Sequence, residues 1–174
     1  MLAHSPSSFP SHAVRAAAFV AAFFVLEMLY QAGRGTPIEA LLVDDLTVRP
    51  AAALINRISP GEGVIAQGHT LSSPRERLSV INGCEGAEVV LMLWAAILTF
   101  HRGPWRRKLH GLAGGALLVF AVNQARVVAL YYSLQYDLTL FGVLHGYVAP
   151  LVMVAAAGIY FLFWITHAQP QRAL

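Results

Sequence analysis

Long apolar runs separated by short polar segments are the main pattern of this chain. Four runs are candidates for membrane-spanning helices, at residues 13–30, 86–100, 111–132 and 146–165. A bilayer core requires about 20 such residues per helix. The second run is short, so we expect it to extend back toward Cys84 or to tilt little. The pattern predicts an all-α membrane protein, a bundle of about four transmembrane helices.

The segment between the first and second runs has local structure of its own. Residues 38–59 carry apolar residues at roughly helical spacing, which predicts a helix along the membrane surface that Pro50 breaks or kinks. Residues 64–81 predict a short hairpin with its turn near residues 72–74.

One transmembrane domain is expected over residues 13–167, after a disordered lead at 1–12 and before a tail at 168–174. The first apolar run is expected to be an uncleaved anchor. Glu27 interrupts its end, and no small-residue cleavage site follows it.

Basic residues are concentrated in one loop, which predicts the orientation in the membrane. Residues 101–110 lack acidic residues and contain Arg102, Arg106, Arg107 and Lys108. The positive-inside rule makes this loop cytoplasmic. Both termini are then cytoplasmic as well, while residues 33–80 and a second loop near 133–144 are extracytoplasmic.

The composition also indicates a protein that is partly surrounded by lipid. Hydrophobic residues make up 57% of the sequence and charged residues only 12%, which is unusual for a soluble domain. The net charge of +3 is explained by topology, so nucleic-acid binding is a poor interpretation of it. Membrane lipids are the expected surroundings, and no cofactor or metal is expected.

Three chemically notable residues are predicted to lie at one level of the bundle. Cys84 stands at the outer start of the second run, and His145 opens the fourth run from the same side. Arg126 comes about 15 residues into the third run, which at about 1.5 Å per residue reaches the outer leaflet. The three therefore converge on the extracytoplasmic face, although they come from different helices.

Each of these residues also has a purely structural interpretation. A single cysteine in an apolar protein is commonly a small buried hydrophobe. Arg126 is explained equally by a salt bridge, for which Glu88 is the candidate partner. Asn123 is explained by a hydrogen bond between helices, and His145 by a position at the membrane interface.

The alternative is a reactive thiol in a polar pocket. Gly83 and Gly86 flank Cys84 and would let a substrate backbone approach closely. A helix N-terminus favours the thiolate, whereas the neighbouring Glu85 opposes it and has no explanation at this stage. Glu88 shares a helix face with Cys84.

A cysteine and histidine pair is the usual arrangement for nucleophilic acyl transfer. In that interpretation His145 is the general acid and base, and Arg126, with Asn123 on the same helix face, stabilises the oxyanion. Together with Glu88 they would line the pocket around the thiol. His69 is a less favoured alternative base on the same side of the membrane.

Three motifs at these positions resemble those of the exosortase/archaeosortase family of membrane cysteine transpeptidases. They are "NGCEGAE" before the second run, "NQAR" in the third and "FGVLHGY" at the start of the fourth. The resemblance covers residues 40–165 and suggests a compact member, of the exosortase H type. It implies that Cys84 is the nucleophile, that Arg126 and His145 are the other catalytic residues, and that Asn123 belongs to the arginine motif.

The resemblance also implies a substrate and a location. Exosortases act on exported proteins whose C-terminal sorting signal has a short motif, a transmembrane helix and a basic tail. Cleavage at the outer face of the cytoplasmic (inner) membrane would give a thioester on Cys84, resolved by an amine or by water. The "CEG" sequence departs from many relatives, which carry a small or polar residue after the cysteine.

Two other classes of function remain open from the sequence. A non-catalytic membrane scaffold or assembly factor explains the helices, but gives no reason for Cys84, Arg126 and His145 to share a level. Another cysteine-dependent membrane acyltransferase would use the same thioester chemistry.

Overall fold

The computed structural model describes residues 10–80, 83–100 and 103–167, and helices dominate it. The expected lead and tail fall largely outside these residues. Helix α1 begins at Pro10, within the range expected for the lead. The long helices are α1 (Pro10–Ala32), α4 (Ala87–Thr99), α5 (Trp105–Tyr136) and α7 (Ala149–Thr166).

Three helical segments are long and apolar enough to cross a membrane, which makes this a multi-pass membrane protein. They are His12–Ala32, Trp105–Tyr136 and Leu138–Thr166, the last composed of α6 (Leu138–Val143), η3 (Leu144–Val148) and α7. The second predicted span, residues 86–100, is only the 13 residues of α4, about 20 Å long. It does not extend back to Cys84, because Gly86 precedes it in a left-handed conformation (φ +79°).

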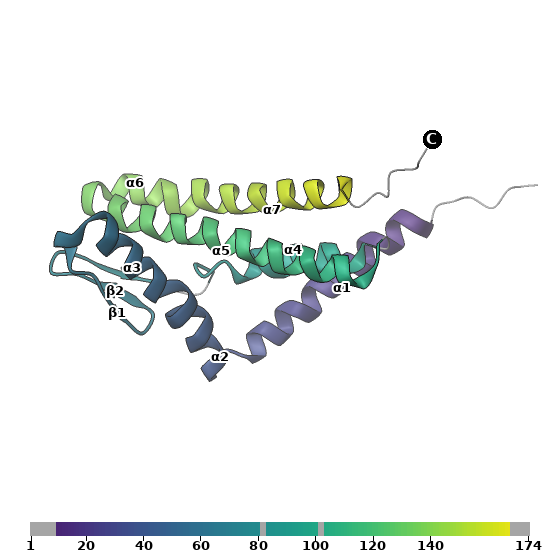
Figure 1. The fold of residues 1–174 in the computed structure, drawn as a ribbon, viewed down its shortest axis with the longest axis horizontal. Coiled ribbons are helices and arrows are strands. Elements are labelled where there is room, and N and C mark those ends of the chain that lie inside the picture. The colour runs from purple at the N-terminus through teal and green to yellow at the C-terminus, as the bar shows by residue number, and fades with distance from the viewer. Residues whose placement is uncertain (1–9, 81–82, 101–102, 168–174) are drawn as a thin grey trace, which may run out of the picture.

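The helices are arranged around a triangular space (Figure 1). Helices α5 and α7 run side by side, and α1 forms a second side of the triangle. The third side is a helical arm composed of α2 (Pro37–Ala40), η1 (Leu41–Val48) and α3 (Arg49–Ile58). The start of α1 and the end of α7 lie at one end of the molecule, opposite the sheet.

Pro50 does not break the arm, contrary to expectation. The preceding segment η1 is π-helical, so the N–H of Arg49 donates to the carbonyl oxygen of Asp44, five residues back. The wider turn accommodates the proline ring without ending the helix. A π-helical turn also occurs before Pro150, where the N–H of Ala149 donates to the carbonyl oxygen of Leu144 in η3.

A small antiparallel sheet follows the arm, and the rest of the described fold is helical, consistent with the predicted all-α membrane class. A 3-10 turn, η2 (Pro60–Glu62), leads to β1 (Ile65–Gln67), β2 (Thr70–Ser72) and β3 (Arg77–Ser79), in that order. The predicted hairpin corresponds to β2 and β3, with its turn at residues 73–76, and β1 is an additional strand. Leu71 and Leu78 are paired across β2 and β3 and are buried against the arm and α5.

The sheet is joined to the C-terminal end of α5 by a partly buried carboxyl group. The hydroxyl of Tyr131 and the Nε2 of Gln135 donate to the same oxygen of Glu62, at 3.0 and 2.8 Å. Arg75 reaches the other oxygen of this carboxyl group at 3.8 Å. These contacts hold the sheet, and the chain that leads from it to Cys84, against α5.

At the opposite end, α5 packs closely on its neighbours through glycines. A Cβ atom on Gly111 would lie 2.4 Å from Nε1 of Trp164 on α7. A Cβ atom on Gly115 would lie 2.6 Å from Cδ2 of Leu93 on α4. Small residues that let backbones approach are the usual means of helix association in lipid.

We predict that Gly111→Ala destabilises the protein by about 1–3 kcal/mol, because a rigid indole blocks the added methyl group. Gly158→Ala on α7 is the matched control. Nothing lies within 4 Å of its Cβ position, so this change should be neutral or stabilise by about 0.5–1 kcal/mol through helix propensity. Thermal unfolding of the detergent-solubilised chain measures both. Equal effects of the two changes would contradict close packing at Gly111.

Candidate active site

Cys84 lies in the short connection between β3 and α4. Its side chain is 9% exposed and belongs to a buried cluster shared by the arm, the sheet and α5. Both flanking glycines have positive φ, +88° at Gly83 and +79° at Gly86. The connection therefore adopts a conformation that other residues rarely accept.

Gly86 is explained by packing, which corrects its interpretation as an access point for a substrate. A Cβ atom there would lie 2.9 Å from Cε of Met153 and 3.3 Å from Cγ of Asn123. The protein's own side chains therefore occupy that space. At Gly83 the nearest contact is Oε1 of Glu88, at 4.0 Å, so this glycine is less crowded.

Arg126 reaches the connection from α5. Its Nη2 donates to Sγ of Cys84 at 3.8 Å, and its Nη1 donates to the carbonyl oxygen of Gly83 at 3.5 Å. A guanidinium beside a thiol favours the thiolate, which is the nucleophilic form. The nitrogen Nε is buried and has no hydrogen-bond partner among the described residues.

Asn123 lies one turn before Arg126 and is 2% exposed. Its side chain contacts Gly86, and its Oδ1 finds no hydrogen-bond partner in the part of the chain that is described. Asn123 and Arg126 thus hold the two ends of the connection that carries Cys84.

Glu88 does not neutralise Arg126. The residue is exposed, and the ion pairs within the described ranges are Arg49–Asp45, His69–Asp44 and Arg75–Glu62. The salt bridge considered from the sequence is therefore not formed among the described residues.

His145 lies in the π-helical segment η3. Its ring stacks on that of Phe141, with centroids 5.6 Å apart and planes 3° apart. Phe141 and Leu144 pack against the buried cluster that contains Cys84. The Nδ1 atom of His145 is buried and lacks a hydrogen-bond partner among the residues described.

His69 has a different environment. It precedes β2, its side chain is 50% exposed, and its Nδ1 pairs with the carboxyl group of Asp44 on the arm. Over the described ranges, no group of three His, Cys, Asp or Glu side chains is arranged to hold a metal ion.

Glu85 has a partner that the sequence did not reveal. The hydroxyl of Tyr30, near the end of α1, donates to its Oε1. Its Oε2 is buried and has no partner among the described residues. Because Tyr30 is 55 positions away on another helix, no local pattern signals this contact.

The site and fold define a class: a multi-pass membrane protein with a buried thiol beside a guanidinium. The family is shown by comparison, because the family described as transmembrane exosortase, EpsH type, matches residues 7–162. This chain therefore belongs to the exosortase family, which confirms the resemblance drawn from the motifs. No curated protein and no solved structure matches the chain.

We predict that Arg126→Leu slows alkylation of Cys84 at neutral pH, because the thiolate loses its neighbouring cation. The chain has a single cysteine, so the rate of iodoacetamide incorporation into the solubilised protein reports this thiol alone. Arg49→Leu is the control, since Arg49 pairs with Asp45 on the arm. Arg126→Lys should keep part of the rate. An unchanged rate in Arg126→Leu would show that the guanidinium does not act on the thiol.

Proposed function

We propose that this protein is a membrane cysteine transpeptidase that cleaves the C-terminal sorting signals of exported proteins. The observation that supports this most strongly is the guanidinium of Arg126 on the sulfur of Cys84. A structural cysteine needs no cation beside it, and a structural arginine in an apolar bundle would be expected to have a carboxylate partner.

The proposed reaction is acyl transfer through a thioester. His145 accepts the proton of the Cys84 thiol, and the sulfur attacks the carbonyl carbon of the scissile peptide bond. Arg126 stabilises the negative charge on the tetrahedral oxygen. Collapse of this intermediate breaks the C–N bond, and His145 returns the proton to the departing amine. An amine acceptor or water then attacks the thioester and releases Cys84.

In this proposal Asn123 is a positioning residue. It packs on Gly86 and so maintains the turn that presents Cys84 to Arg126. The donor for the oxyanion is Arg126, whose two terminal nitrogens already face the connection.

We place the thiol on the extracytoplasmic side of the cytoplasmic membrane. The basic residues Arg106, Arg107 and Lys108 lie in the first turn of α5, at the end of the bundle opposite the sheet. The positive-inside rule assigns that end to the cytoplasm, and therefore the sheet and Cys84 to the outside. A scaffold without catalysis, or a different acyltransferase, would be separated from this proposal by the following experiment.

We predict that co-expression with a reporter carrying a C-terminal sorting signal from the same genome yields a shortened reporter. Cys84→Ala should abolish the cleavage, because it removes the nucleophile. His145→Ala should lower the rate at least about 100-fold through loss of acid–base catalysis. His69→Ala is the matched control and should cleave at nearly the wild-type rate, because His69 pairs with Asp44. Immunoblotting of the reporter over time measures each rate.

Cleavage that survives Cys84→Ala would refute the thioester mechanism. If His69→Ala loses cleavage while His145→Ala remains active, the general base is His69 and not His145. A soluble product with an added amine indicates transpeptidation, and a free carboxyl terminus indicates hydrolysis.

We predict which end of the bundle faces the outside of the cell. Two cysteines, each introduced alone into the Cys84→Ala variant, test this. Arg75→Cys, beside the sheet, should react with a membrane-impermeant maleimide in intact cells, since the Arg75 side chain is 79% exposed. Trp105→Cys, at the other end, is 59% exposed and should react only after permeabilisation. The reverse pattern would place the site on the cytoplasmic face.

A further inference from the structure

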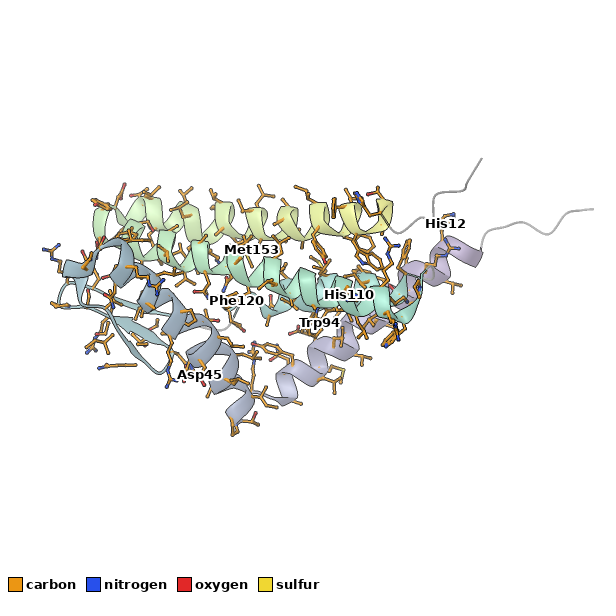
Figure 2. All side chains as sticks on the ribbon, in the orientation of Figure 1. His12, Asp45, Trp94, His110, Phe120 and Met153 are labelled. Carbon is orange, nitrogen blue, oxygen red and sulfur yellow. The ribbon has the colours of Figure 1, made fainter. Side chains whose placement is uncertain are left out.

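A groove is lined by residues of α1, η1 of the arm, α4 and α5, and by Glu85. Its volume is about 480 Å³, and its wall is almost entirely apolar. Figure 2 labels two of its lining residues, Trp94 of α4 and Phe120 of α5. The groove begins at Glu85, the residue directly after Cys84, and continues along α4 through Ala87 to Trp94.

The polar side chains of this groove are few, and one of them is incompletely satisfied. The hydroxyl of Thr47 donates to the carbonyl oxygen of Leu42, and that of Tyr30 donates to Glu85. The remaining oxygen of Glu85, Oε2, is buried without a partner in the described part of the chain. A buried acceptor that lacks a donor is costly, so it points to a ligand that brings one.

We infer that this groove receives the first two turns of the substrate's transmembrane helix and that Glu85 caps the N-terminus of that helix. The inference rests on the proposed function, because it takes the substrate to be cleaved at Cys84. The scissile bond then lies just before the substrate helix, and the helix runs along α4 toward the basic end of the bundle.

The chemistry of a helix N-terminus matches Glu85. The first four N–H groups of a helix have no internal partners, and the helix dipole favours a negative group beside them. In lipid no water is available to satisfy these groups, so an acceptor supplied by the enzyme is worth more than at a soluble surface. Glu85 Oε2 is such an acceptor, one residue from the nucleophile.

The length of the groove also matches two turns of a substrate helix. Ala87, Val90, Leu91 and Trp94 line it at helical spacing, and seven residues of helix rise about 10 Å, or two turns of a partner helix. Ala116 and Phe120 of α5, which packs beside α4, also line the groove. A phospholipid is a poorer occupant, because its phosphate would meet the carboxyl group of Glu85 as a like charge.

The test is photocrosslinking in the Cys84→Ala variant, so that substrate is bound and not consumed. A benzophenone amino acid is placed at Leu117, which lines the groove and is 67% exposed. The matched control is Ile159 on α7, which is 68% exposed and lies outside the groove. The probe is the reporter of the cleavage experiment. We expect adducts with its hydrophobic segment from position 117 and only background from position 159.

The role of Glu85 is tested in the same system. Glu85→Gln keeps the size of the side chain and an acceptor for Tyr30, but weakens the cap. We expect about a tenfold rise in KM for cleavage with kcat little changed, and fewer adducts at position 117. An Asp at the start of the reporter's hydrophobic segment supplies its own cap and should restore binding to Glu85→Gln. A purely structural role for Glu85 would not respond to this change in the substrate.

The outcomes separate this inference from the proposed function. Cys84-dependent cleavage without adducts at position 117 overturns the groove and leaves the reaction intact. Adducts at position 117 with cleavage that does not need Cys84 support the groove and refute the thioester. Adducts with lipid alone, equal adducts at both positions, or no rescue by Asp overturn the inference.

Discussion

A guanidinium in an apolar bundle needs hydrogen-bond acceptors, and the arrangement around Cys84 follows from this requirement of Arg126. On insertion scales such a group costs about 2.5–3.5 kcal/mol near the bilayer centre. Glu88 is exposed and does not pair with Arg126, so the contacts seen are with the backbone oxygen of Gly83 and the sulfur of Cys84. These acceptors are reached only if the connection lies against α5. The contacts that accommodate the arginine are therefore those that bring a cation to the thiol.

The two π-helical segments show how this bundle admits proline within long helices. Each precedes a proline, Pro50 in the arm and Pro150 in the last span, and the helix continues past each proline. The second segment contains His145. A wide turn displaces a side chain from its regular helical position, and such turns are frequent at functional sites. The ring stacks on Phe141, and its Nδ1 is buried with no hydrogen-bond partner among the described residues, which indicates that the ring is held by packing.

The sequence predicted the long helices and the meeting of Cys84 with Arg126, because apolar length, loop charge and helical rise are local quantities. It did not predict the start of α4 at Ala87, since the left-handed conformation of Gly86 beside Asn123 and Met153 is not visible in apolar spacing. Periodicity also failed at Pro50, because a π-helical register is not visible in apolar spacing. The contact between Glu85 and Tyr30 depends on how α1 docks on α4, which no single helix specifies.

The carboxyl group of Glu85 does not act directly on the thiol of Cys84, because the two side chains point toward different helices. Cys84 faces α5, where Nη2 of Arg126 is 3.8 Å from its sulfur, whereas Glu85 turns to Tyr30 on α1 and to the groove. The cation therefore contacts the sulfur directly, while the carboxyl group is held away from it by another helix. Under the proposed function, two adjacent residues would serve two parts of one substrate: the thiol would meet the peptide bond, and the carboxyl group would meet the helix that follows it. A small or neutral residue at position 85 would relieve the electrostatic conflict but would leave the N–H groups of that helix without an acceptor in lipid.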